Sequence, residues 1–341
     1  MKKHQITIVD IAKELNISKS TVSRALTDNP NINKATKKKV LNLAKKLDYQ
    51  KNMLAISLIT NKSNTIGIIV PDFITSYFPN VIIGAQNVAS KSGYNVIISQ
   101  SNESFYTEVK NANVMLANQV DGILVSVTRE TKTFDHLKVF QRKGIPIVFF
   151  NRICEDMIVP KVIVDDYEGA FSAVEHLITI GKKRIAHFAG PRSLSISNKR
   201  LNGYNDALVK HGISIDQDLI IHAENNGNDI QDQISKLLKL TKPCDAIFAF
   251  NDPTAVEIIK ALKKLNINIP KDMAVVGFSN DYVSEIIEPS LTTVAQPVKQ
   301  IGETAAQLLI DQINRDVKDW KAVTKVLKTT LILRNSTVNQ S

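Results

Sequence analysis

Apolar residues in the first fifty positions recur every three to four residues, which is the spacing of one face of an α-helix. The first such segment begins near residue 8, the second follows residue 18, and the third runs from about residue 33 to residue 48. Their apolar positions are Ile8, Ile11, Ala12 and Leu15, then Val22, Ala25 and Leu26, and finally Val40, Leu43, Ala44 and Leu47. The pattern predicts a small all-α unit of three helices over residues 1–50.

Polar residues mark where the first two of these helices begin. Thr7 is a good N-cap residue, and Asp10 places a carboxylate at the positive end of the first helix. The apolar spacing breaks at residues 16–18, where Ser18 can cap the second helix. Two helices joined by so short a turn are typical of the helix-turn-helix, whose second helix enters the DNA major groove. The polar face of that second helix consists of Lys19, Ser20, Thr21, Ser23 and Arg24.

The pattern changes from residue 64 onward to short apolar runs separated by amphipathic helices. The runs cover residues 66–70, 96–98, 123–127, 145–150, 185–189, 246–250 and 274–278, with helices such as 81–91, 170–180 and 254–265 between them. Such alternation predicts an α/β fold with doubly wound parallel sheets, here in two copies. Continuous apolar runs indicate strands that are buried on both faces. Ligands of such folds bind beyond the carboxyl ends of the strands, in this case in a cleft between two lobes.

Charge divides the chain at the same place. Residues 1–63 contain 13 lysines and arginines against four acids, a formal charge of +9, whereas the remaining 278 residues contain 30 against 29. A basic segment joined to a nearly neutral body is expected of a protein that binds the phosphate backbone of a nucleic acid. The alternative is a solvated lysine-rich surface without a partner, and the coincidence with a helix-turn-helix pattern argues against it.

Several classes of function lack their sequence signatures. The chain has no P-loop, no dinucleotide-binding glycine motif, no nucleophile elbow and no zinc-protease motif, so we expect no enzyme and no cofactor. Six scattered histidines form no metal-ligand spacing, and Cys154 and Cys244 are expected to be buried free thiols. No apolar run approaches the ~18 residues that span a bilayer, and the N-terminus has no secretory apolar core. We therefore expect a cytoplasmic protein that does not associate with membranes.

Three strings in the head resemble the LacI/GalR family of bacterial transcriptional regulators. They are T-I-x-D-I-A over 7–12, S-x-x-T-V-S-R-x-L over 18–26, and Y-x-x-N-x-x-A-x-S-L over 49–58. The resemblance continues through VPDFITSYF (70–78), FFNR (149–152), KRLNGY (199–204), FAFNDPTA (248–255) and VVGFSND (275–281). It implies a helix-turn-helix head over 1–50, a hinge helix and linker over 51–63, and a periplasmic-binding-protein-like effector and dimerisation domain over 64–341. Its N-terminal lobe is expected to hold about 64–163 and 293–323, and its C-terminal lobe about 164–292 and 324–341.

The resemblance also implies roles in DNA binding. Arginine pairs with a guanine edge in the commonest base contact, and an apolar wedge can kink DNA from the minor groove. The implied base-reading residues are Lys19, Ser20 and Arg24 of the second helix and Leu58 of the hinge. The implied backbone contacts are Thr7, Ser18, Thr21, Ser23, Thr27, Tyr49 and Asn52. Each hydroxyl taken alone is better explained as a cap or turn residue, and Leu58 could instead pack on the effector domain.

The effector-binding residues implied by the resemblance are Asp72, Phe78, Ser126, Asn151, Arg200, Asn251, Ser279 and Gln296. Amides, hydroxyls and a guanidinium suit the hydroxyls of a sugar. Arg200 could instead form a surface salt bridge, and Asn251 could merely cap a helix. Many sugar-responsive relatives carry Asp where Asn151 and Ser279-Asn280 stand, so Asp252 or Asp281 could replace the missing carboxylate, or the ligand could differ.

The sequence thus predicts a homodimeric regulator, expected to be a repressor, that binds a near-palindromic double-stranded operator. A small-molecule effector, expected to be a sugar or sugar derivative, would control it, with a purine-like or protein corepressor as alternatives. A sugar-binding transport protein fits the body alone but not the basic head or the missing signal peptide.

Overall fold

The computed structural model describes residues 6–50, 62–222 and 230–338. The chain divides into two compact units, residues 1–63 and residues 64–341. Hinge residues Asn52 and Leu58, for which DNA contacts are expected, lie outside the described residues.

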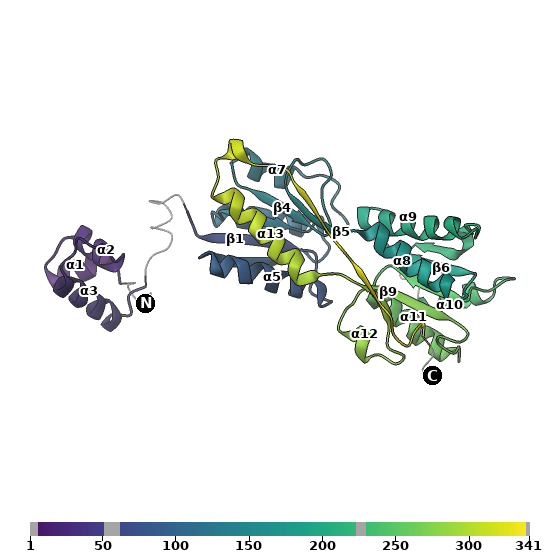
Figure 1. The fold of residues 1–341 in the computed structure, drawn as a ribbon. Coiled ribbons are helices and arrows are strands. Elements are labelled where there is room, and N and C mark those ends of the chain that lie inside the picture. The colour runs from purple at the N-terminus through teal and green to yellow at the C-terminus, as the bar shows by residue number, and fades with distance from the viewer. Residues whose placement is uncertain (1–5, 51–61, 223–229, 339–341) are drawn as a thin grey trace. The chain divides into compact units, whose positions relative to one another are not determined.

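The first unit contains the three expected helices, α1 (Ile8–Leu15), α2 (Lys19–Leu26) and α3 (Lys34–Lys46). They pack around one apolar cluster, in which Ile11, Val22 and Val40 have no exposed surface. The apolar face of each helix supplies this cluster, so the helical periodicity of the sequence is confirmed. Figure 1 shows the three helices as one small bundle.

The second unit is built on two sheets, which Figure 1 shows in separate lobes. Each sheet has six strands. The first sheet is parallel throughout and has the order β11-β5-β4-β3-β1-β2. Its strands are β1 (Thr65–Val70), β2 (Asn95–Gln100), β3 (Gly122–Val125), β4 (Ile147–Phe150), β5 (Lys161–Val164) and β11 (Thr324–Leu327). Its helices are α5 (Tyr77–Lys91), α6 (Phe105–Ala117), α7 (Asp135–Arg142) and α13 (Val298–Ile313), with a 3-10 turn at Val317–Asp319.

The second sheet has the order β12-β10-β9-β8-β6-β7 and is parallel except for the antiparallel edge strand β12. Its strands are β6 (Ile185–Ala189), β7 (Ile220–His222), β8 (Ala246–Ala249), β9 (Ala274–Ser279), β10 (Thr292–Ala295) and β12 (Thr330–Ile332). Its helices are α8 (Asp166–Thr179), α9 (Ser195–Lys210), α10 (Ile230–Leu238), α11 (Asp252–Lys264) and α12 (Val283–Ile286), with a 3-10 turn at Gln217–Leu219. Together with the head, this arrangement confirms the expected fold class.

The chain crosses between the lobes three times; the first crossing lies close to the expected residue 163, and the other two lie a few residues later than expected. Strand β10 was assigned mostly to the N-terminal lobe, but it pairs with β9 of the second sheet. Strand β11 was assigned to the C-terminal lobe, but it pairs with β5 of the first sheet. Both strands approach a crossover, where an apolar run does not reveal which sheet supplies its hydrogen-bond partners.

Helices cover both faces of each sheet, and the apolar cores lie between helix and sheet layers. On one face of the first sheet, α5 and α13 run side by side in close contact (Figure 1). A β-carbon at Gly84 would collide with the carbonyl oxygen of Lys299, and one at Gly302 with that of Val81. The two glycines therefore let the helix backbones approach more closely than larger residues would allow. Within the described residues, no helix has the length and apolar character needed to cross a bilayer.

Candidate DNA interface and effector cleft

Helix α2 presents a polar face to solvent from a well-packed helical unit. Val22 and Ala25 are buried, whereas Lys19, Ser20 and Arg24 are exposed. The exposed side chains can therefore reach a DNA groove without disturbing the core of the head. Ser23 is also exposed, and Thr21 is half-buried.

Several hydroxyls expected at the phosphate backbone also stabilise the local fold. The Thr7 side chain accepts a hydrogen bond from the backbone N–H of Val9, and Asp10 completes a capping box with Thr7. Ser18 accepts from the N–H of Thr21 at 3.1 Å and caps α2. The cap interpretation is thus confirmed for Thr7 and Ser18, and both side chains remain exposed.

Thr27 and Tyr49 are also expected to contact the DNA backbone. The hydroxyl of Thr27 donates to the carbonyl oxygen of Ser23 at 3.0 Å. Tyr49 is half-buried against the core of the head, and this burial raises the pKa of its hydroxyl. A neutral phenol can still donate a hydrogen bond to a phosphate oxygen.

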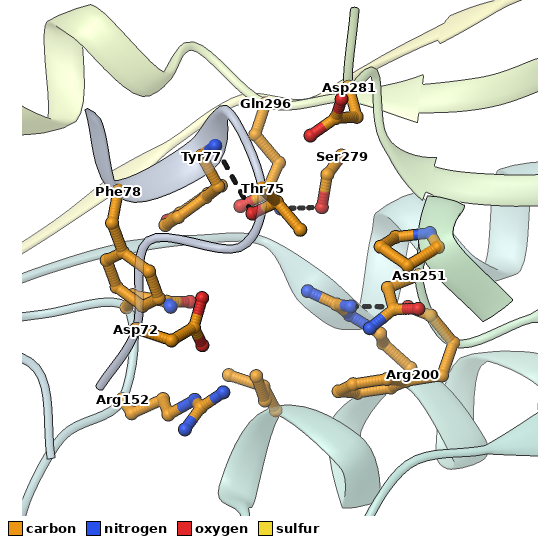
Figure 2. Close-up of a pocket in the computed structure, with 14 residues that line it drawn as sticks. Asp72, Thr75, Tyr77, Phe78, Arg152, Arg200, Asn251, Ser279, Asp281 and Gln296 are labelled. Atoms are coloured by element: carbon orange, nitrogen blue, oxygen red, sulfur yellow. Dashed lines mark hydrogen bonds between the residues drawn. The ribbon is translucent and has the colours of Figure 1, made fainter. Parts of the chain in front are cut away.

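The effector body contains a cavity of about 100 Å³ between its two lobes. Residues from both sheets line it, and Figure 2 shows Asp72 and Arg152 facing Asn251 and Arg200 across one space. Of the residues expected there, the lining includes Asp72, Phe78, Asn151, Arg200, Asn251, Ser279 and Gln296. Ser126, the remaining one, is fully buried after β3 and does not line this cavity. The lining residues not expected are Thr75, Tyr77, Arg152, Ile196, Phe250, Pro253 and, beyond a suggested substitute role, Asp281.

Most of the unexpected lining residues are sequence neighbours of expected ones. Thr75 and Tyr77 lie between Asp72 and Phe78, and Arg152 directly follows Asn151. All follow the carboxyl ends of strands, where the fold places its ligands. Proximity to a strand end was therefore a usable signal, whereas nothing in the sequence indicated that Ile196 would reach the cavity.

Arg200 is held in a buried ion pair and not in the surface salt bridge considered as an alternative. Its Nε and Nη2 donate to one carboxylate oxygen of Asp166 at 2.9 and 2.7 Å, and both side chains are 3% exposed. Its Nη1 donates to the carbonyl oxygen of Phe250, and the guanidinium lies over the rings of Phe250 and Phe278. Burial raises the pKa of Asp166, and the adjacent guanidinium opposes that shift.

Asn251 has the capping role that the sequence left open. Its side-chain oxygen accepts the N–H of Thr254 at 2.9 Å and so caps α11. Because the oxygen serves the cap, the amide nitrogen is the group available to a ligand.

Three buried polar atoms of the lining have no hydrogen-bond partner within the described part of the chain. They are the hydroxyl of Tyr77, Oε1 of Gln296 and Nε of Arg152. Burial raises the pKa of Tyr77, so its hydroxyl stays neutral and can donate. An unsatisfied buried polar group costs free energy, and a polar ligand in the cavity would remove that cost.

A hydrogen-bonded network joins the lobes beside the cavity. Asp281 from the second lobe accepts from the backbone N–H and the hydroxyl of Ser76, at 2.8 and 2.9 Å. The N–H of Asp281 donates to Asp252, which also accepts from the hydroxyls of Ser284 and Thr293. Asp252 is fully buried and does not line the cavity, so Asp281 is the one of these two acids that reaches it.

Metal and thiol chemistry find no support within the described residues. No group of three or more histidine, cysteine, aspartate or glutamate side chains there could hold a metal ion. Cys154 and Cys244 are buried free thiols, and burial raises the pKa of Cys244 to about 11.

Two family comparisons cover nearly the whole chain. Residues 7–52 match the bacterial regulatory proteins of the lacI family. Residues 63–335 match the periplasmic binding proteins and sugar binding domain of the LacI family. The chain belongs to the LacI family. It is therefore a DNA-binding transcriptional regulator, and the family consists of regulators and not of enzymes.

Individual relatives match this LacI-family chain over almost their full length. Catabolite control protein A of Priestia megaterium is 32% identical over 319 residues, which cover 93% of this chain and 96% of the relative. The transcriptional repressor CytR of Escherichia coli K12 is 31% identical over 331 residues, 97% of this chain and 96% of the relative. The structure of the transcriptional regulator CelR in complex with cellobiose has a TM-score of 0.73 and 25% identity, and the match covers 97% of this chain and 99% of that one.

Proposed function

We propose that this LacI-family regulator is a repressor that acts as a homodimer on a near-palindromic double-stranded operator and responds to a carbohydrate effector. The observation that carries the effector assignment is the inter-lobe cavity with its three unpartnered polar atoms. Relatives named as a repressor and as a cellobiose complex support the proposal.

On the DNA side, the exposed face of α2 reads the bases. Lys19, Ser20 and Arg24 contact base edges, while exposed hydroxyls and the +9 charge of residues 1–63 bind the backbone. Residues 51–63 form the hinge and linker in this proposal, with Leu58 as the minor-groove wedge. The head comprises residues 1–50 and the effector domain residues 64–341.

The outer edge of the first sheet supports a homodimer. Strand β2 is the edge strand there, and Ile98 on it is 42% exposed. The flanking helices α5 and α6 add the exposed apolar side chains Ile83 and Val114. An exposed apolar edge strand invites pairing with a second copy.

In the cleft, the chemistry fits a polyol. Carboxylate, amide and hydroxyl groups from Asp72, Asn151 and Ser279 offer directed hydrogen bonds, and Phe78 offers an apolar ring face. Asp281 supplies the carboxylate that many sugar-responsive relatives carry at the positions of Ser279 and Asn280. Ser126 lies outside this cavity and has no direct role in the proposal.

A thermal-shift screen of the full protein against neutral sugars, sugar phosphates and purines tests the effector class. A saturable rise in melting temperature with a neutral sugar, accompanied by release of selected operator DNA, is the expected result. Release identifies an inducer, while tighter DNA binding identifies a corepressor. Stabilisation by purines alone would overturn the carbohydrate assignment, and specific DNA binding without any small-molecule response would favour a protein corepressor.

A further inference from the structure

A second, larger chamber of about 470 Å³ adjoins the inner cavity. The two share part of their lining, namely Asp72, Thr75, Arg152, Phe250, Asn251 and Pro253. The outer chamber adds Ile74, Gln100, Asn102, Glu103, Arg129, Gly190, Pro191, Leu194 and Thr254. The cleft is therefore one continuous space with an inner and an outer part.

The sizes of the two parts differ in a way that matters for the ligand. One water needs roughly 10–15 Å³ of such volume, so the inner cavity has room for roughly seven to ten water-sized groups. The inner cavity therefore has room for no more than one sugar ring. The outer chamber has several times that volume and shares six lining residues with the inner cavity.

An apolar platform extends along both parts of the cleft. Leu194, Ile196 and Phe250 form a small buried cluster separate from the main cores. Ile196 faces the inner cavity, Leu194 the outer chamber, and Phe250 both. These side chains give the cleft an apolar border along both parts, where the apolar faces of two consecutive rings could lie.

The loop after β2 forms the polar wall opposite this platform. Asn102 and Glu103 both have left-handed backbones, with φ of 51° and 57°. Asparagine adopts this conformation more readily than most residues, whereas for Glu103 it is uncommon. Here the Glu103 carboxylate accepts from Nη1 of Arg152 at 2.7 Å and from the backbone N–H of Arg129 at 3.0 Å.

Charges in the whole cleft balance. Three arginines, Arg129, Arg152 and Arg200, face three acids, Asp72, Glu103 and Asp281. Arg152 and Arg200 are moreover already bound to carboxylates. A site for a phosphorylated ligand would offer an excess of cationic donors, so the balance favours an uncharged one.

A contact between the lobes lies beside the outer chamber. The hydroxyl of Ser193, between Pro191 and Leu194, donates to the carbonyl oxygen of Arg129 at 3.0 Å. This hydrogen bond joins the two lobes at the edge of the outer chamber.

We propose that the outer chamber is a second sugar subsite and that the effector is an uncharged glycoside of two linked rings. The inner ring occupies the cavity between Tyr77 and Arg200, and the outer ring lies over Leu194 and beside Asn102. The assignment rests on the proposed carbohydrate effector and specifies its class.

A matched pair of variants separates the two subsites. Asn102 lines only the outer chamber and Asn151 only the inner cavity, and both have left-handed backbones, with φ of 51° and 58°. Because glycine adopts this conformation freely, Asn102→Gly and Asn151→Gly each remove an amide without straining the backbone. The probes are common neutral disaccharides and their component monosaccharides, titrated into the full-length protein by calorimetry, with DNA binding as the check on folding.

We expect a disaccharide to bind the wild-type protein more tightly than either component. Asn102→Gly should weaken the disaccharide about three- to tenfold, the loss of one hydrogen bond, and leave the component monosaccharide unchanged. Asn151→Gly should weaken both ligands.

Three other outcomes overturn the assignment at different levels. A monosaccharide as the tightest ligand, with no effect of Asn102→Gly on any sugar, removes the outer subsite and leaves the carbohydrate effector standing. Preference for a sugar phosphate contradicts the uncharged class. Absence of binding by every sugar overturns the carbohydrate effector itself, and the outer subsite with it.

Discussion

Arg200 lines the cleft and is also expected to stabilise the fold, because its guanidinium and the Asp166 carboxylate are both buried. Arg200→Ala leaves Asp166 as an uncompensated buried acid, and removal of one partner of such a pair costs about 3–5 kcal/mol. We expect this loss in the free energy of unfolding of the effector domain, measured by urea denaturation.

The matched control is Arg184→Ala. Arg184 pairs with Asp216 at 3.0 Å, but both side chains are about one-third exposed, so the expected loss is about 0–1 kcal/mol. Equal losses in the two variants would show that Arg200 is no more than a surface ion pair. At temperatures where the Arg200→Ala variant is still folded, we expect it to bind the operator. The effector should not change that binding.

Arg24 is the side chain of α2 best suited to read a guanine. Arg24→Ala should cost about 1–3 kcal/mol on a selected operator and relax base preference at one position. Lys38→Ala on α3, another exposed cation of the head, should weaken selected and random DNA alike. Competition binding measures both, and an equal loss on random DNA for Arg24→Ala would contradict base reading.

His187 makes stability depend on pH. It is fully buried between the rings of Tyr204 and Phe248, and burial lowers its pKa to about 4. The unfolded chain, with an ordinary histidine pKa near 6.5, therefore binds a proton that the folded protein rejects between about pH 6.5 and pH 4. Stability is complete above that window and falls as the pH decreases through it, by about 2 kcal/mol at pH 5.

Replacement by phenylalanine tests this contribution, since that ring fits the stack and does not titrate. The difference between the urea midpoints at pH 7.5 and pH 5 should be smaller for His187→Phe than for the wild-type protein. An unchanged difference between the two pH values would mean that other groups cause the acid sensitivity.

Several of the residues that line the cleft could be predicted from the sequence, but their contacts could not. The motif positions after strand ends brought Asp72, Asn151 and Asn251 to one cavity, because the fold fixes where strand ends meet. The partner of Arg200 was not predictable, since Asp166 is 34 residues away and their meeting depends on how α8 packs against α9. Ser126 follows a strand end as well, yet its side chain is enclosed after β3.

At the level of elements, a residue of the other lobe binds the N-cap residue of helix α5. Ser76 makes no cap of its own, and Asp281 accepts its N–H and hydroxyl instead. An acid at a helix N-terminus also interacts favourably with the helix dipole. Closure of the lobes therefore stabilises the first turn of α5.

Ser76→Ala should shift the lobes toward the open form. Loss of the hydroxyl bond is worth about 1 kcal/mol, or roughly a fivefold decrease in effector affinity, although Ser76 does not line the cavity. Ser104→Ala is the control, because Ser104 caps α6 within a single lobe. Calorimetry with the sugar found in the screen measures the affinity, and equal affinities for the two variants would contradict a closure role.

The periodicity of the sequence placed the elements of both units well. Helices α1 to α3 and the central strands follow from their apolar spacing, because each buries a face or a whole run in a local layer. The expected lobe boundaries near residues 293 and 324 lie a few residues before the ends of β10 and β11, because sheet membership depends on partners that lie far away in the sequence.

For the whole molecule, the edge of β2 is the expected dimer contact. Ile98→Asp places a charge on that edge and should convert the dimer into a monomer, with a large loss of operator affinity because one head binds instead of two. Ile158→Asp changes a more exposed isoleucine of the same lobe, 83% against 42%, and should leave the dimer intact. Light scattering after size exclusion gives both masses, and an intact Ile98→Asp dimer would place the interface elsewhere.

Helix α13 has a consequence for how the protein is made. Its side chains Ile301, Ala305 and Leu309 complete the core over the first sheet, and β11 adds the last strand to that sheet. On the ribosome, the first sheet lacks α13 and β11 until the entire second lobe except β12 has been synthesised. Its earliest strands must then wait through more than two hundred residues of synthesis, with an apolar face available to chaperones.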